Sequence, residues 1–277
     1  MSNRKISPTP YPEVNVVLKE LLSQVQEILG YQFAGMYLYG SLAYGGFDSD
    51  SDIDYVVVTT EEPSEGSFSR LQAMHTRLAA LDIWCATQME GSYIPLHALQ
   101  QYDPARALYL HIDRGREEHL HRMLIDDARL SRAWWGGWVF LRAVLWENGI
   151  VLAGPDPRTI IEHVSPDELK QANFATLKEW FRPLLDHPSE LANCGYQSYY
   201  VLTLCRILYT LEHGAIVSKQ VAAYWAQKKL GDPWTDLIER ACAGRHNPDT
   251  KAQAVDVSGT MDFIRYTLEI SQCADPK

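Results

Sequence analysis

Two aspartates, Asp52 and Asp54, stand two positions apart at the start of the apolar run 55–58. Successive side chains of a strand point to opposite faces, so a strand here directs both carboxylates to one face while Ile53 faces the core. Two like charges at short range are unfavourable alone and become favourable when a divalent cation lies between them. The pattern therefore predicts a Mg²⁺ site held by Asp52 and Asp54.

A glycine and a serine, Gly40 and Ser41, precede this pair and follow the apolar segment 33–39. Glycine permits a tight turn whose backbone can approach a phosphate, with the serine hydroxyl beside it. The order of Gly-Ser, about ten further residues and Asp-x-Asp on a strand resembles the signature of the DNA-polymerase-β-like nucleotidyltransferase superfamily. The stretch 39–58 therefore indicates a nucleotide-transfer site.

Two other interpretations of the acidic stretch are weaker. Asp48, Asp50 and Asp52 have the spacing of the first EF-hand ligands, but position six is Ile53 instead of Gly and position twelve is Thr59 instead of Glu. A merely solvated acidic turn is the second alternative, since charge runs commonly have no further role.

A third carboxylate, Asp82, lies in the segment 81–86, where alternating apolar residues predict a short strand. Leu81, Ile83 and Cys85 would share one face of that strand, and Asp82 would point the other way. An ordinary strand-edge aspartate is the alternative interpretation.

The composition, 46% hydrophobic and 22% charged over 277 residues, is that of a folded protein with room for two domains. The formal net charge is -10, and residues 1–100 hold five Lys and Arg against twelve Asp and Glu. Because nucleic-acid binding depends on Lys and Arg that neutralise phosphates, we expect a small cationic substrate and no nucleic-acid partner.

The five cysteines are widely spaced and form no Cys-x-x-Cys, so neither a disulfide framework nor a zinc site is indicated. They are typical of reduced thiols in the cytoplasm. The most apolar later stretch, 134–154, is interrupted by Arg142, Glu147 and Asn148, so we expect no membrane span.

Periodicity predicts helices over 13–29 and 68–80, strands over 33–39 and 53–59, and an apolar helix from Trp134 to Gly149. The segment 95–132 is charged and gives no clear element. Its histidines are expected on the surface of a charged helix rather than at a metal: His111, His119 and His121.

Turn residues over 153–157 predict a domain boundary, which gives an N-terminal domain 1–157 and a C-terminal domain 158–277. A capping box from Ser165 to Glu168 opens the second half. That half is expected to be all-helical, with helices over 166–185, 196–213, 218–230, 233–243 and 258–272. The predicted fold class is α+β, a mixed sheet with flanking helices followed by an all-α helical bundle.

Two cations stand out in the helical half. Arg206 lies in the apolar run 201–209, where a buried charge needs an anionic partner. Lys219 follows Ser218, a plausible N-cap, and so lies beside exposed helix amides that favour anions. An ordinary salt bridge or a surface side chain is the alternative for each.

The segments 201–209 and 214–225, together with 39–41 and 51–54, are similar to the streptomycin/spectinomycin adenylyltransferases, the aminoglycoside 3''(9)-O-nucleotidyltransferase family. The resemblance implies a nucleotidyltransferase domain and a helical bundle that bind ATP, Mg²⁺ and drug between them. It implies triphosphate contacts from Gly40, Ser41 and Ser51, Mg²⁺ ligands at Asp52 and Asp54, and nucleotide contacts from Arg206 and Lys219.

The same resemblance places Asp82 where the family has its catalytic Glu, as the base and a further metal ligand. It aligns Trp180 with a drug-contacting Trp, whereas Tyr196 replaces an acidic residue. A second family Trp has no counterpart near Asp113 and Arg114. Because those two departures concern streptomycin binding, a spectinomycin-like acceptor is favoured.

We therefore expect a monomeric, cytoplasmic, Mg²⁺-dependent enzyme of antibiotic resistance that moves AMP from ATP to an aminoglycoside or aminocyclitol hydroxyl. A nucleotidyltransferase with another small-molecule or protein acceptor is one alternative. A catalytically silent regulator with the same fold is another, and the acidic composition disfavours a polynucleotide-directed enzyme.

Overall fold

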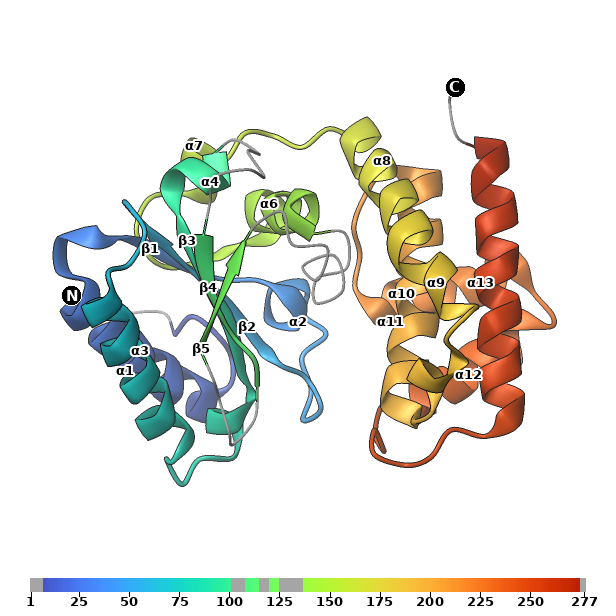
Figure 1. Ribbon diagram of the computed structural model, residues 1–277, viewed down its shortest axis with the longest axis horizontal. Coiled ribbons are helices and arrows are strands. Elements are labelled where there is room, and N and C mark those ends of the chain that lie inside the picture. The colour runs from blue at the N-terminus through green and yellow to red at the C-terminus, as the bar shows by residue number, and fades with distance from the viewer. Residues whose placement is uncertain (1–6, 101–107, 115–119, 125–136, 275–277) are drawn as a thin grey trace. The chain divides into compact units, whose positions relative to one another are not determined.

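The computed structural model describes residues 7–100, 108–114, 120–124 and 137–274. The described residues up to 124 and those of 142–163 form one unit, and those of 137–141 and 164–274 form a second. Figure 1 shows a sheet with helices in the first unit and a helical bundle in the second, which confirms the α+β class. The domain limits 1–157 and 158–277 remain a prediction, and 158–163 fall here in the first unit.

The first unit contains a mixed sheet with the strand order β5-β4-β3-β2-β1-β6. Only the β2–β3 pairing is parallel among the described strands, and the other neighbours are antiparallel. The strands are β1 (Phe33–Leu38), β2 (Ile53–Thr59), β3 (Met89–Pro95), β4 (Leu108–Ile112), β5 (Leu120–Leu124) and β6 (Ile150–Ala153).

Two helices, α1 (Pro12–Leu29) and α3 (Glu65–Ala79), lie side by side against the sheet (Figure 1). Ile53, Tyr55 and Val57 of β2 are fully buried in the core that these helices share with the sheet. Because side chains alternate along a strand, Asp54 lies on the opposite face. The helices predicted over 13–29 and 68–80 are confirmed as α1 and α3, and the predicted strands as β1 and β2, with β2 beginning at the predicted residue.

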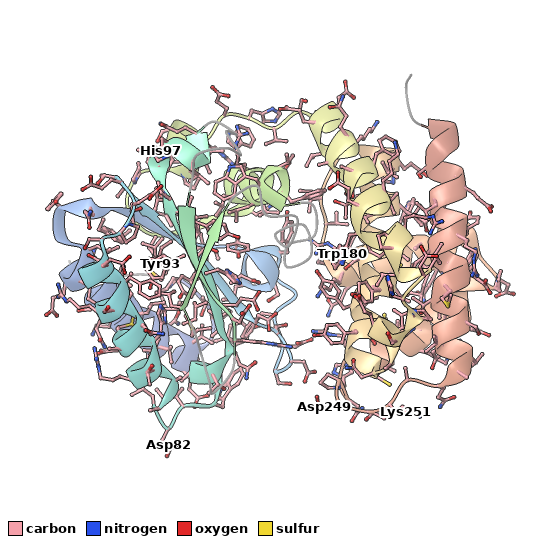
Figure 2. All side chains as sticks on the ribbon, in the orientation of Figure 1. Asp82, Tyr93, His97, Trp180, Asp249 and Lys251 are labelled. Carbon is pink, nitrogen blue, oxygen red and sulfur yellow. The ribbon has the colours of Figure 1, made fainter. Side chains whose placement is uncertain are left out.

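The predicted strand over 81–86 is wrong. α3 ends at Ala79, and the segment continues through the 3-10 helix η2 (Trp84–Gln88) into β3. Leu81, expected to face the core, is 39% exposed, so the alternation does not reflect a buried face. Asp82 is exposed at the tip of this connection, at the lower edge of Figure 2.

The segment 95–132 contains the short helix α4 (Leu96–Gln100) and the strands β4 and β5. His111 lies on β4 and is 2% exposed, so its expected place on the surface of a charged helix is wrong. His121 lies on β5 rather than on a helix, and His119 lies outside the described residues. The apolar helix predicted from Trp134 is α6 (Gly137–Asn148).

In the second unit, α10 (Cys194–His213) is the central helix and packs against its helical neighbours. Ser165 and Glu168 form the predicted capping box, and Gly214 ends α10 in a left-handed conformation. The surrounding helices are α8 (Pro166–Thr176), η3 (Leu177–Phe181), α9 (Arg182–Leu184), α11 (Lys219–Leu230), α12 (Trp234–Gly244) and α13 (Ala254–Ala274). No helix in the described ranges is long and apolar enough to cross a membrane.

Candidate active site

Four segments meet at one edge of the sheet. β2 and β3 are parallel and both begin there, while the antiparallel strands β1 and β4 both end there. The edge therefore carries the Gly40-Ser41 turn after β1, Asp52 and Asp54 at the start of β2, Glu90 at the start of β3, and Asp113-Arg114 after β4. The topology thus gathers acidic, basic and hydroxyl side chains from distant parts of the chain.

Gly40 is required by the close approach of Asp54. The amide of Tyr39 donates to the Asp54 carbonyl oxygen at 3.1 Å, which brings the two chains together. Gly40 has φ +63°, and a Cβ at this position would lie 1.8 Å from Asp54 Oδ2. The predicted tight turn opens the short helix α2 (Gly40–Tyr44), and only glycine leaves space for the carboxylate.

Glu90 is the carboxylate that stands beside Asp54. The two residues are register partners on the parallel strands, and Met89 next to Glu90 is fully buried on the opposite face. Burial first, and then the charges of Asp52 and Asp54, raise the pKa of Glu90 to about 8. A carboxyl group with this pKa is mostly protonated at pH 7, so it can act as a base only in its ionised form, and it holds a proton firmly once it has accepted one.

The same carboxylates act on Tyr39. Its phenol is buried, and burial followed by the charges of Asp54, Glu90 and Asp52 raises the pKa of Tyr39 well above its ordinary value. The phenol therefore stays neutral, so Tyr39 adds no negative charge to this edge of the sheet.

A hydrogen-bonded chain lies beside Glu90 on the same face. Ser92 Oγ is 2.9 Å from His111 Nδ1, and His111 Nε2 is 3.3 Å from Asp113 Oδ1. Ser92 and His111 are buried register partners, whereas Asp113 is 62% exposed. Ser92 is fully buried and is therefore inaccessible as a nucleophile. The hydrogen-bonded chain instead holds the end of β4 next to Glu90.

Asp52 is paired with Arg114. The guanidinium Nη1 contacts Asp52 Oδ1, and both side chains are partly exposed. A cation thus already neutralises one of the two predicted metal ligands.

Asp52 and Asp54 fit a Mg²⁺ ion. Among the described residues no three His, Cys, Asp or Glu side chains are grouped closely enough to hold a metal by themselves. Mg²⁺ commonly binds one or two carboxylates and completes its shell with water and substrate phosphates. Two hard oxygen donors beside a glycine that leaves space meet that requirement, whereas Asp82 has no place beside them.

The two predicted phosphate-binding serines differ in their surroundings. The Ser41 hydroxyl makes only a long contact, 3.5 Å, to the Asp52 carbonyl oxygen. The buried Ser51 hydroxyl donates to Asp48 Oδ1 at 2.8 Å and accepts from the Asp48 amide at 3.1 Å. Ser51 therefore stabilises the acidic turn itself, and Ser41 is the better placed of the two to bind a ligand.

In the second unit, Arg206 contacts the residue before the N-cap of α11, and Lys219 is the first residue of that helix. Arg206 Nε donates to the Val217 carbonyl oxygen at 3.2 Å, and the Lys219 ammonium lies 5.1 Å from the ring centre of Tyr199. Ser218 caps α11 by accepting from the Val221 amide, as predicted. Two cations and a helix N-terminus thus form a basic surface on this unit.

Trp180 and Tyr196 belong to an aromatic cluster next to this basic surface. Trp180 is 5% exposed and packs against Tyr199 and Tyr200 at centroid distances of 5.6 and 5.5 Å. Tyr196 is 59% exposed and stacks on Tyr200. Trp180 is labelled in Figure 2 in the segment before α9. Tyr196 therefore offers the larger accessible surface for a ligand.

Two family models match the chain. The model of a nucleotidyltransferase domain matches residues 18–120, and that of the aminoglycoside adenylyltransferase C-terminal domain matches residues 159–269, which together are more than half of the chain. The chain belongs to the aminoglycoside adenylyltransferase family. It is accordingly an enzyme of the nucleotidyltransferase class, as the sequence predicted.

Curated proteins are similar in sequence to this family member over nearly its whole length. A spectinomycin 9-adenylyltransferase of Campylobacter jejuni is 25% identical over 268 residues, which covers 91% of this chain and 94% of the relative. An aminoglycoside (3'') (9) adenylyltransferase of Escherichia coli is 25% identical over 266 residues, with coverage of 92% and 93%.

The fold is also that of a solved adenylyltransferase. The crystal structure of a spectinomycin adenylyltransferase from an Enterococcus species, with ATP and spectinomycin, superimposes with a TM-score of 0.65 and 15% identity. The similarity covers 92% of this chain and 98% of that one.

The sequence analysis did not assign Glu90, His111 or Arg114 to the site. A signal for Glu90 was present, because Met89, Gly91 and Tyr93 alternate with Glu90 and Ser92. Tyr93 is fully buried, and Figure 2 shows it between the sheet and the helices.

Proposed function

We propose that this enzyme transfers AMP from ATP to a hydroxyl of a small cationic aminocyclitol-type antibiotic and releases pyrophosphate. The observation that carries the proposal is the register pairing of Asp54 with Glu90 beside Gly40, at the sheet edge where Asp52 also lies. The curated relatives act on spectinomycin or related aminoglycosides by their names, which supports the acceptor class.

In this proposal Glu90 is the general base. Its carboxylate takes the proton of the acceptor hydroxyl, whose oxygen forms a bond to the α-phosphorus of ATP while the bond from that phosphorus to the bridging oxygen of pyrophosphate breaks. A Mg²⁺ ion bound by Asp52 and Asp54 would supply charge neutralisation for the triphosphate. The raised pKa of Glu90 suits it to hold the proton after transfer.

Arg206 and Lys219 are proposed to bind phosphate oxygens of ATP. Both are cations at the N-terminal end of α11, where the Ser218 cap leaves an electropositive helix start. In the first unit, Gly40 and Ser41 are proposed to bind triphosphate oxygens at the turn after β1. Ser51 would act indirectly, by holding the turn that leads to Asp52.

The acceptor is proposed to be spectinomycin-like rather than streptomycin-like. The family position that bears an acidic residue is occupied by the exposed Tyr196, which offers an aromatic face and no charge. Trp180 would act mainly by supporting the aromatic cluster around it, because it is nearly fully buried. We further propose that the enzyme works as a monomer in the cytoplasm, where ATP is supplied.

Pyrophosphate release tests the proposal directly. The purified protein, ATP and Mg²⁺ would be incubated with spectinomycin, streptomycin and other aminoglycosides, with Asp54→Asn as the inactive control. Turnover with spectinomycin and little with streptomycin is expected. ATP binding without turnover on any acceptor would instead identify a silent nucleotide-binding protein.

A further inference from the structure

Arg114 lies beyond the end of the β4 ladder. The last paired residue of β4 is Ile112, which pairs with Gly91 and with Leu120, so the described ladder stops two residues before Arg114. The Arg114 side chain is 46% exposed, and its guanidinium contacts the 32% exposed carboxylate of Asp52. Charge on Asp52 is therefore what positions this guanidinium.

The surroundings of Arg114 are acidic. Asp54, Glu90 and Asp113 share its edge of the sheet, and His111 is engaged by Asp113. Within the described part of the chain, Asp52 is the one side chain with which Arg114 pairs. A guanidinium has five N–H donors, so most of its donors remain for another acceptor.

A metal ion bound by Asp52 would compete with Arg114 for this carboxylate. Two cations at one carboxylate oxygen repel each other, so a bound divalent ion favours departure of the guanidinium. In the proposed function the metal binds together with an anionic triphosphate, and the planar fork of arginine fits phosphate oxygens.

We propose that Arg114 exchanges partners: it neutralises Asp52 when no metal is bound and binds a phosphate oxygen of ATP once a metal has taken Asp52. The inference rests on the proposed function. Arg114 would thus neutralise the Asp52 carboxylate in the absence of metal and bind ATP in its presence. A purely structural ion pair would not do both.

The exchange predicts opposite effects of one substitution. Arg114→Ala removes the competitor of the metal, so Mn²⁺ alone should bind about threefold more tightly. The same change removes a phosphate contact, so ATP with Mg²⁺ should bind about tenfold more weakly. Arg114→Lys keeps a positive charge, so its affinities for Mn²⁺ and for ATP should lie between those of the wild type and those of Arg114→Ala.

Calorimetry on the full chain measures both affinities, first with MnCl₂ alone and then with ATP in Mg²⁺ without acceptor. Arg70→Ala is the matched control, because Arg70 is an exposed arginine of the same unit whose guanidinium donates to the Ile28 carbonyl oxygen. Arg70→Ala should change neither affinity. A gain for Mn²⁺ cannot come from misfolding, so the first measurement also guards against a damaged variant.

Unchanged Mn²⁺ affinity in Arg114→Ala, or unchanged ATP affinity, would overturn the exchange while leaving the proposed function standing. Wild-type protein that binds neither ligand would overturn the proposed function together with this inference. Opposite shifts in Arg114→Ala, with no shift in Arg70→Ala, would support it.

Discussion

Asp54 and Glu90 are register partners on the parallel strands β2 and β3, and both leave the sheet on the face opposite to the buried Ile53 and Met89. Parallel strands begin at the same edge, so the crossover through α3 brings two carboxylates together that are far apart in sequence. In the proposed function, this pairing places a ligand of the divalent cation, Asp54, next to the general base, Glu90.

Asp52→Asn and Asp54→Asn should each lower turnover by about 10²-fold or more, because each change removes a hard anionic ligand that Mg²⁺ prefers. Far-UV circular dichroism and the thermal midpoint should show that both variants remain folded. Pyrophosphate release close to that of the wild type from either variant would contradict the metal assignment.

Glu90→Gln should lower kcat by about 10²-fold and leave ATP affinity nearly unchanged, since a general base acts in the chemical step. Asp82→Asn is the matched comparison, because Asp82 is exposed in the connection after α3. It should retain wild-type kcat. If Asp82→Asn were the slow variant and Glu90→Gln the normal one, the assignment of the base would be reversed.

The part of this site that the sequence predicted is local. The Asp52–Asp54 pair, the Gly40-Ser41 turn and the caps of α8 and α11 depend on neighbouring residues, whose types determine the backbone. Each could be recognised from a few consecutive positions.

Glu90 could not be selected in the same way. The segments 81–86 and 89–95 both alternate, and only the pairing of β3 with β2 decides which carboxylate lies beside Asp54. His111 and Arg114 depend on β4, a five-residue strand within a charged segment where periodicity is too short to be recognised. The pairing of β3 with β2 and with β4, which joins segments far apart in the sequence, therefore determines which side chains lie at the site.

Gly40→Ala should disable the site, because its Cβ would overlap Asp54 Oδ2 and the left-handed backbone penalises any side chain. We expect turnover to fall by about 10²-fold. Gly45→Ala separates the two causes, since Gly45 has φ +73° but open space where a Cβ would stand. Gly45→Ala should lose some thermal stability and keep its turnover, and equal losses of turnover in both variants would contradict the overlap argument.

Lys219→Ala should weaken ATP binding by about 1.5 to 3 kcal/mol if the ammonium binds a phosphate, as for other charge-assisted contacts. Lys228→Ala is the control, because Lys228 lies on the same helix over the Tyr224 ring. By linkage, Lys219→Ala should also reduce any gain in acceptor affinity that ATP produces. Calorimetric titration of ATP into both variants measures the difference, and equal affinities would remove Lys219 from the nucleotide site.

His75 should make the protein sensitive to acid. Its Nε2 lies 2.7 Å from the Tyr93 hydroxyl and 3.3 Å from that of Tyr55, and burial lowers the pKa of His75 to about 3. The unfolded chain takes up this proton near pH 6.5 and the folded chain does not, so the free energy of unfolding falls as pH decreases from about 6.5 towards 3. Between pH 7 and pH 5, His75 alone should remove about 2 kcal/mol from the free energy of unfolding. Urea denaturation of wild type and His75→Gln at both values tests this, because the variant lacks the titrating ring. Equal losses in the two proteins would show that His75 is not responsible for the acid sensitivity.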